Sequence, residues 1–254
     1  MSNINSHIRI PRCVLKQFED EKHFVYLWNF EDSQINRGHA KSINTEEGYY
    51  SESIEHFLRD NIETPLGSVL KFVKGIDCSS PEFTMGDDMK RIIRRFVYAL
   101  LARSESLLKK VKETSIFAQF LSVQNQHDMA VVMGIEEAIN AQVFEDWEIT
   151  FVENHTEVPF VLPLSGSYSF SLNGDTMFNI PITPHYAITF MHKSIAHKYV
   201  LDGKMRLLQV VNPEQAMRFN MFALSSEQKD WNYGIAASSR TVLEKMKELA
   251  QQKT

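Results

Sequence analysis

Four polar side chains in the first part of the chain are of types that perform acid–base chemistry or hold an anion. They are His7, Arg12, Glu63 and Arg103. Imidazole and carboxylate groups exchange protons in catalysis, whereas guanidinium groups hold carboxylates and phosphates through paired hydrogen bonds. His7 and Glu63 are therefore the catalytic candidates, and Arg12 and Arg103 are the anion-binding candidates.

These four residues form a charge-assisted network if the fold brings them together. Two roles are open for such a network. It fixes only the packing of helices, or it binds a substrate anion and supplies acid–base groups for a reaction. A structure in which the four side chains lie apart would remove the catalytic role.

A second candidate site is a basic helix face formed by Lys90, Arg91, Arg94 and Arg95. Lys90 and Arg94 are an i, i+4 pair, and so are Arg91 and Arg95, so four positive charges repel one another on one helix. That repulsion favours an external anion, such as phosphate or the acidic surface of a partner, and a nucleic acid is one source of phosphate. The alternative is a solvated face that the 32 acidic residues of the chain neutralise.

Patterns for metals and cofactors are missing from the sequence. His185, His192 and His197 are separated by seven and five residues, unlike the compact pairs typical of zinc sites. Cys13 and Cys78 are too few for a disulfide framework and lack CxxC spacing. There is no glycine-rich phosphate loop, nucleophile elbow, HExxH motif or EF-hand loop. We therefore predict no metal and no cofactor.

Composition indicates an ordinary globular protein. Of the 254 residues, 43% are hydrophobic and 23% are charged, and the net charge is only -5. No apolar run approaches the ~18 residues that a membrane span needs, and the first residues lack the apolar core of a signal peptide. We expect a soluble, cytoplasmic protein with no membrane partner.

The elements that must position the polar residues change character near residue 145. Before it, helical spacing is expected just after Pro11 and from Ser51 onward, with Thr64-Pro65 as a cap or kink. Further helices are expected over Asp88–Lys112, Ser115–Val123 and Asp128–Phe144. Alternating aromatic residues predict a strand over His23–Phe30, followed by a polar loop over Glu31–Gly38. The first 145 residues are thus expected to be mainly helical apart from one early strand or hairpin.

The second half is predicted to be rich in strands. Strands or apolar runs are expected at Trp147–Phe151, Val158–Leu164, Tyr168–Leu172, Ala187–His192 and Met205–Val211, and helices are expected after Asn212 and over Thr241–Gln251. Nothing between the halves looks like a flexible tether. The prediction is a single α+β domain, 1–254, with a mainly helical part over 1–145 and a strand-rich part over 146–254.

Several of these segments occur in an order that resembles a known family. PRCVLKQF follows His7, an aromatic strand FVYLWNF comes next, and GYYSESIEHFLRDNIE ends at Glu63. LLARSES then contains Arg103, and VVNPEQAMRFN contains Asn212. This order is similar to that of the bacterial family named domain of unknown function 4238. The resemblance implies the fold and a bacterial context, and it implies no reaction.

The chain also departs from that family's pattern. His7 stands four residues before Pro11, where the family has three, and Arg103-Ser104-Glu105 replaces its Arg-Thr-Pro. The family's Ser-Asp-x-Pro has no counterpart in PFVLPLSGSYSF, which contains no Asp. If that Asp were catalytic, this chain would be inactive or would work differently.

Three hypotheses about function follow. The first is a binding or interaction protein that holds an anionic partner, extending to a nucleic acid or nucleotide in a bacterial defence-type system. The second is a metal-independent hydrolase or nuclease that uses His7 and Glu63 with Arg12 and Arg103. The third is an obligate subunit of an oligomer, in which the aromatic FVYLWNF strand packs against another chain.

Overall fold

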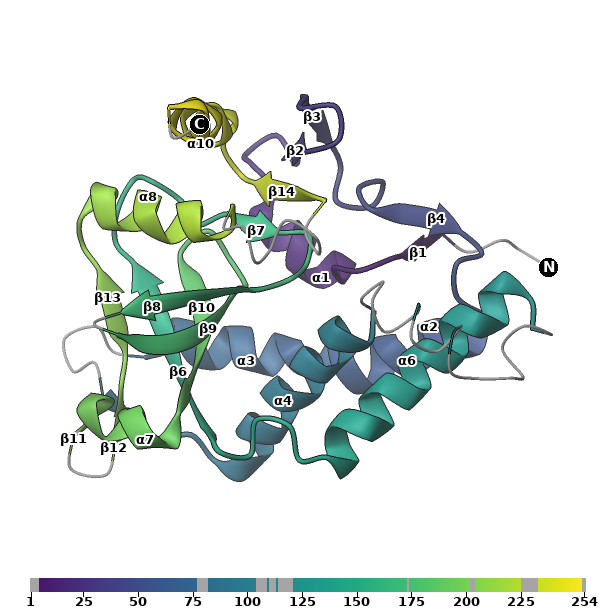
Figure 1. Cartoon of the computed structure of the whole chain (residues 1–254), viewed down its shortest axis with the longest axis horizontal. Helices are drawn as coiled ribbons and strands as arrows, with labels where there is room; N and C mark the ends of the chain where they lie inside the picture. The colour runs from purple at the N-terminus through teal and green to yellow at the C-terminus, as the bar shows by residue number, and fades with distance from the viewer. Residues whose placement is uncertain are drawn as a thin grey trace. The chain divides into compact units, whose positions relative to one another are not determined.

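A computed structural model of the chain describes residues 5–76, 82–103, 109, 113, 121–172, 174–201, 204–224 and 233–252 (Figure 1). The chain divides into two compact units. Unit 1 consists of Met1–Pro11, Asn44–Lys74 and Met85–Glu145, and unit 2 consists of Arg12–Ile43, Gly75–Thr84 and Asp146–Thr254. Unit 1 is mainly helical and unit 2 is rich in strands, which confirms the predicted α+β class. The single-domain organisation stays a prediction.

Unit 1 is built on helices that are close in sequence. Its described elements are β1 (Asn5–His7), β4 (Thr45–Glu47), α2 (Glu52–Leu58), η2 (Arg59–Glu63), α3 (Thr64–Lys74), α4 (Asp87–Ala102) and α6 (Val123–Asn140). α4 contacts both α3 and α6, so it is the central helix of the unit. β1 and β4 pair antiparallel, with His7 opposite Thr45.

Apolar residues at steps of three and four produce the buried faces of these helices. Leu66, Val69 and Val73 on α3 are at most 1% exposed, as are Ile93 and Phe96 on α4. Each such side chain contributes about 1.5–3 kcal/mol when it is fully buried. The spacing that predicts the helices therefore also identifies the faces through which they pack.

The bounds of the helices differ from the predicted ones at several places. α4 begins close to the expected residue but ends at Ala102, and the remainder of the predicted helix to Lys112 lies almost entirely outside the described residues. Most of the predicted helix Ser115–Val123 also lies outside them. α6 begins at Val123, five residues before the expected start, because the Ser122 side chain accepts a hydrogen bond from the Asn125 amide and caps it.

The chain stays helical through Thr64-Pro65, although its hydrogen bonding changes. Arg59–Glu63 form a π-helical turn, in which the Thr64 N–H donates to the Arg59 carbonyl. Proline has no N–H, and its ring clashes with the carbonyl four residues earlier. A wider turn before Pro65 removes that conflict, and α3 then continues. The expected cap or kink is thus a π turn that ends at Glu63.

Unit 2 contains a five-stranded sheet with the order β13-β6-β10-β9-β8. Its strands are β6 (Trp147–Asn154), β8 (Tyr168–Leu172), β9 (Asp175–Pro181), β10 (Tyr186–His192) and β13 (Leu208–Val210). All neighbours pair antiparallel except β13 and β6, which are parallel. Figure 1 shows β8, β9, β10 and β6 as successive strands of this sheet, in teal and green.

Two smaller sheets and several helices complete unit 2. One sheet has the order β3-β2-β14-β7 and the other β11-β12-β5. The strands are β2 (Val25–Asn29), β3 (Ile35–Gly38), β5 (Glu82–Phe83), β7 (Leu162–Pro163), β11 (Val200–Leu201), β12 (Lys204–Arg206) and β14 (Gly234–Ala237). The helices are α1 (Arg12–Leu15), η1 (Lys16–Phe18), α7 (Lys193–Ala196), η4 (His197–Tyr199), α8 (Pro213–Phe222) and α10 (Arg240–Gln251).

The first half of the chain contains more strands than predicted. β2 lies inside the expected strand, but β3 pairs with it where a loop was expected up to Gly38. β3 has the sequence Ile-Asn-Arg-Gly, and it is at the edge of its sheet. The sequence pattern misses it because an edge strand with polar residues lacks the apolar alternation of a half-buried strand. The loop prediction for this segment is therefore wrong.

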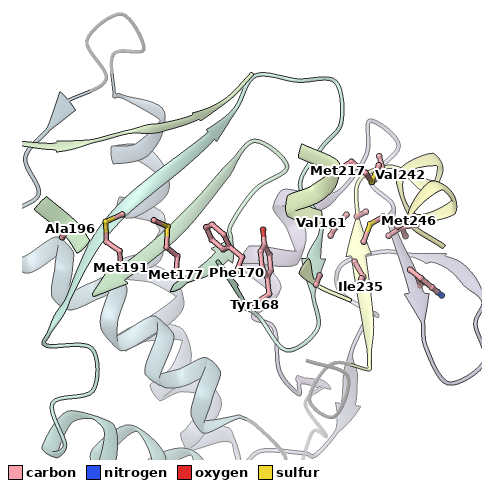
Figure 2. Packing of buried hydrophobic residues seen from close by; sticks show 14 residues of the cluster. Val161, Tyr168, Phe170, Met177, Met191, Ala196, Met217, Ile235, Val242 and Met246 are labelled. Atoms are coloured by element: carbon pink, nitrogen blue, oxygen red, sulfur yellow. The ribbon is translucent and has the colours of Figure 1, made fainter. Parts of the chain in front are cut away.

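An apolar cluster in the described part of unit 2 joins the five-stranded sheet to two helices. Tyr168, Phe170, Met177 and Met191 come from adjacent strands and lie in one row in Figure 2. Met217 of α8 and Met246 of α10 belong to the same cluster. The row arises because residues that pair across adjacent strands point to the same face of a sheet.

A chain of hydrogen bonds crosses the buried part of this sheet. The Asn179 amide donates to the Tyr168 hydroxyl at 2.7 Å, and the Thr189 hydroxyl donates to the Asn179 carbonyl oxygen at 2.6 Å. All three residues are 0% exposed. Burial raises the pKa of the Tyr168 phenol, which therefore stays neutral. Asn179 satisfies the polar groups of two neighbouring strands at once.

Replacing Asn179 with Ala is expected to lower the free energy of unfolding by about 2–4 kcal/mol, because it leaves two buried hydroxyls unpaired and opens a small cavity. Urea unfolding monitored by circular dichroism measures the change. The control is Thr176→Ala on β9, since Thr176 is exposed. Equal effects of the two substitutions would contradict the role of Asn179.

Candidate functional site

The candidate site in unit 1 is centred on Arg103, the residue that follows the last turn of α4. Its side chain is only 1% exposed. Nη1 donates to the carbonyl oxygen of Arg9 at 3.2 Å, and Nη2 lies 3.5 Å from Oε1 of Glu63. A cation at the C-terminus of a helix is also favoured by the helix dipole. Arg103 thus joins the end of α4 to the N-terminal segment and to the π turn.

Two buried N–H donors beside this segment have no acceptor among the described residues. One is Nε of Arg103 and the other is Nδ2 of Asn44. Asn44 adjoins the same stretch of chain, since its carbonyl oxygen accepts from the Ile8 amide at 3.0 Å. Buried polar groups are nearly always hydrogen-bonded, so each of these donors requires an explanation.

Ser6, Tyr50 and Glu55 form the next part of the site. The Ser6 hydroxyl accepts from the Tyr50 amide at 3.2 Å, and the Tyr50 hydroxyl donates to the carbonyl oxygen of Ile8 at 3.1 Å. Burial raises the pKa of Tyr50, so its phenol remains a neutral donor. These contacts hold the Tyr50 ring against the N-terminal segment.

The half-buried carboxyl of Glu55 has a raised pKa. Burial is the main cause, and the negative charges of Glu63 and Asp128 act in the same direction. A hydrogen bond with Ser6 and the positive charge of Arg103 act in the opposite direction without cancelling the effect. Glu55 therefore holds a proton more readily than an ordinary glutamate does.

α6 supplies the residues that hold the Tyr49–Ser51 segment. The Gln124 amide donates to the carbonyl oxygens of Gly48 and Tyr50, both at 3.0 Å. His127 stacks on Tyr49 with ring centroids 3.7 Å apart, and its Nδ1 lies 3.1 Å from the Tyr49 carbonyl oxygen. Because a carbonyl only accepts, Nδ1 carries the proton.

Asp128 extends this arrangement by accepting a hydrogen bond from the Ser51 amide at 3.0 Å. Sequence reasoning missed Glu55, Gln124, His127 and Asp128. They carry no motif, and they are separated by many residues from the groups that they contact. The adjacent His127 and Asp128, at the start of the helix predicted from Asp128, were the only available signal.

The four residues proposed from the sequence have different positions. The structure brings Glu63 and Arg103 together. His7 is half-buried on β1 in the same unit, next to Ser6. Arg12 is exposed at the start of α1 and belongs to unit 2. The convergence of Arg12 with Arg103, and a catalytic role for His7, stay predictions.

The basic helix face lies on α4, and carboxylates engage part of it. Arg91 pairs with Asp88 one turn earlier, and Arg94 pairs with Glu145 at 3.3 Å. Arg95 is exposed, whereas Lys90 is half-buried. These ion pairs reduce the positive charge that the face offers to a partner. The test of nucleic-acid binding uses Lys90 and Arg95, one residue from each i, i+4 pair of the predicted face.

If this face binds nucleic acid, the Lys90→Ala/Arg95→Ala variant will bind short DNA and RNA duplexes more weakly. The slope of log K against log salt will fall by about 1 for each phosphate that the variant no longer neutralises. Fluorescence anisotropy at several salt concentrations measures both quantities. Lys71→Ala/Lys74→Ala on α3 is a matched control. Affinity that changes with neither salt nor substitution would contradict a nucleic-acid role.

Two histidines of the second half, His185 and His192, serve local structure. His192 accepts from the Ser194 amide and caps α7, and His185 Nδ1 donates to the carbonyl oxygen of Asn154 at 3.2 Å. Within the described ranges, no group of three or more His, Cys, Asp or Glu side chains is arranged to hold a metal ion. Among the described helices, none has the length and apolar character needed to cross a membrane.

Comparison with protein families identifies the family to which most of the chain can be aligned. The family model DUF4238, described as a protein of unknown function, matches residues 7–226. The chain belongs to this family. The match begins at His7 and includes Glu63 and Arg103, so the DUF4238 segment contains the central pair of the site. No curated protein and no solved structure matches the chain.

Replacing Glu55 with Gln is expected to make the stability difference from the native chain depend on pH. The raised pKa of Glu55 means that ionisation costs folded-state stability as pH rises through that pKa. The variant, which stays neutral, should therefore gain stability relative to the native chain as the pH rises from about 4, near the ordinary pKa of Glu, to neutral pH. Urea unfolding midpoints across this range measure the change.

Glu46→Gln is the control for this experiment, because Glu46 is exposed on β4. Its difference from the native chain should vary less with pH. A Glu55→Gln difference that is constant from acid to neutral pH would show that the carboxyl is not destabilised by its surroundings.

Proposed function

We propose that this DUF4238 protein is a binding protein whose unit 1 holds a small anionic group, a carboxylate or a phosphate, at Arg103 and Asn44. The observation that carries the proposal is the Arg103 guanidinium. It is 1% exposed, and its Nε has no acceptor among the described residues. Asn44 provides a second buried donor beside the same backbone segment.

The energetics of buried donors support an anionic ligand. A buried N–H group without an acceptor costs about 1–3 kcal/mol. A carboxylate or phosphate oxygen would remove that cost and add charge-assisted hydrogen bonds with a planar guanidinium. The ligand class therefore follows from the donors: a group with at least two acceptor oxygens and a negative charge.

The carboxylates of Glu63 and Glu55 affect how strongly an anion binds at Arg103. The Glu63 oxygen lies 3.5 Å from Arg103, longer than the ~2.9 Å of a strong charge-assisted hydrogen bond, so the guanidinium is not fully engaged. The raised pKa of Glu55 reduces the negative charge nearby when the pH falls. Anion binding should therefore be stronger at mildly acidic pH than at alkaline pH.

Other parts of the functional hypothesis rest on the sequence alone. They are a hydrolase or nuclease that uses His7 and Glu63, an obligate oligomer, a cytoplasmic location, and a part in a bacterial defence-type system. A protein or nucleic-acid partner at the basic helix face belongs with them. The buried donors favour binding over the two alternatives, the enzyme and the obligate oligomer.

The test is calorimetric titration of the full chain with inorganic phosphate and, separately, with acetate. Arg103→Lys keeps the positive charge but removes Nε–H and the planar fork, and it should weaken binding about tenfold or more. Arg95→Lys, at an exposed position of α4, should bind as the native chain does.

A second substitution separates a binding effect from a folding effect. Asn44 has a positive φ of 56°, which Asp also tolerates, so Asn44→Asp should preserve the backbone. It replaces the amide donor with a carboxylate and should weaken anion binding while the thermal unfolding midpoint stays close to that of the native chain. Undetectable binding of both anions to the native chain, or equal affinity in all variants, would overturn the proposal.

A further inference from the structure

A second group of ionisable side chains lies in unit 2, at the end of β6. Glu153 is 5% exposed, and both of its carboxylate oxygens have partners. The Tyr186 hydroxyl donates to Oε1 at 2.7 Å, and Nε2 of His155 lies 2.9 Å from Oε2. A buried carboxylate thus holds a phenol on one side and an imidazole on the other.

The strand pattern explains why these residues meet. Glu153 lies opposite Tyr186 on β10, so their side chains share one face of the sheet. His155 lies just beyond the strand, where its amide donates to the Val210 carbonyl at 2.9 Å and fixes the backbone. The arrangement is therefore built by the sheet and not by a loose surface contact.

This geometry determines the tautomer of His155. A carboxylate oxygen only accepts, so Nε2 of His155 must carry the proton that is donated to Glu153. The neutral ring then has its lone pair on Nδ1. The His155 side chain is 36% exposed, in contrast to the 7% exposure of the Glu153 side chain. An imidazole oriented by a buried carboxylate and reachable by solvent is the arrangement of a general base.

We infer that Glu153 and His155 form a second site, in which His155 acts as the general base for hydrolysis of carboxylic esters and Glu153 positions it. Nδ1 removes a proton from water while the water oxygen bonds to the ester carbonyl carbon. The bond from that carbon to the alcohol oxygen then breaks, and the imidazolium returns the proton to the departing oxygen. Ester and water become carboxylic acid and alcohol, with no other reactant.

The site is independent of the anion site proposed for unit 1, since it shares no residue with it. The sequence offered little to indicate it. Asn154-His155-Thr156 matches only a glycosylation sequon, and Asn154 is 3% exposed, with its amide nitrogen 2.7 Å from the Val158 carbonyl oxygen. The buried side chain that this motif would modify instead supports the backbone beside His155.

The experiment measures release of p-nitrophenolate from p-nitrophenyl acetate by the full chain. His155→Gln is expected to lower the rate at least about tenfold, since general-base catalysis contributes about 10²–10⁴-fold. His185→Gln is the matched control, because His185 is also exposed but its Nδ1 contacts a backbone carbonyl. The control should hydrolyse the ester as fast as the native chain.

The split between kcat and KM tests the positioning role of Glu153. Glu153→Gln keeps an oxygen that can accept from Nε2 of His155 but removes the negative charge that orients the ring, so kcat should fall while KM stays close to the native value. Tyr186→Phe removes one donor from the carboxylate and leaves its contact with His155, so it should lower kcat less than Glu153→Gln does, which keeps the test valid if Glu153→Gln does not fold. A native rate equal to that of His155→Gln, or an equal loss in His185→Gln, would overturn the inference.

Discussion

The burial of one positive charge is the constraint on which unit 1 depends. Arg103 holds the end of α4, the backbone of Arg9 and the carboxylate of Glu63 in one place. Water cannot solvate a guanidinium that is 1% exposed, so the surrounding chain must supply its partners. Removing the opposite charge from such a pair typically costs about 3–5 kcal/mol, because the remaining charge stays buried. The N-terminal segment and the π turn are therefore positioned by the same side chain.

The two polar centres of the chain differ in the sign of the buried charge and in how completely that charge is paired. In unit 1 a buried cation has partners for only some of its donors, whereas in unit 2 the buried carboxylate of Glu153 has a partner at each oxygen. The first arrangement suits the recognition of an added acceptor. The second suits the orientation of a neighbouring group, since a fully satisfied carboxylate fixes the ring that it contacts.

Periodicity predicted helices such as α4 and strands such as β8, because burial itself creates the pattern, whereas the central strand β9 was not predicted. Phe96 on α4 and Phe170 on β8 lie on the buried faces that their spacing predicts. The polar edge strand β3 was missed for the same reason. Chemical type grouped Glu63 and Arg103 with His7 and Arg12, and the structure joins Glu63 to Arg103. The family match adds that both lie in the DUF4238 segment.

Other residues of the candidate site could not be found in this way. The contact between Ser51 and Asp128 joins residues 77 positions apart, and a single sequence carries no signal for such a pairing. The raised pKa of Glu55 likewise depends on burial and on charges from other elements, which a residue's own position in the chain does not reveal. Fold class can thus be predicted from local patterns, whereas a site assembled from distant segments cannot.

The π turn at Arg59–Glu63 makes the length of this segment as important as its composition. A π turn contains one residue more than the α-helical turn that it replaces, and each residue of an α-helix advances the side-chain direction by about 100°. Loss of any one residue from the turn would convert it to an α turn and would bring back the clash between the Pro65 ring and the carbonyl four residues earlier. Glu63 and the buried face of α3 could then no longer both keep their present directions, so relatives that share the Arg103–Glu63 pair should resist insertions and deletions here even where the individual side chains vary.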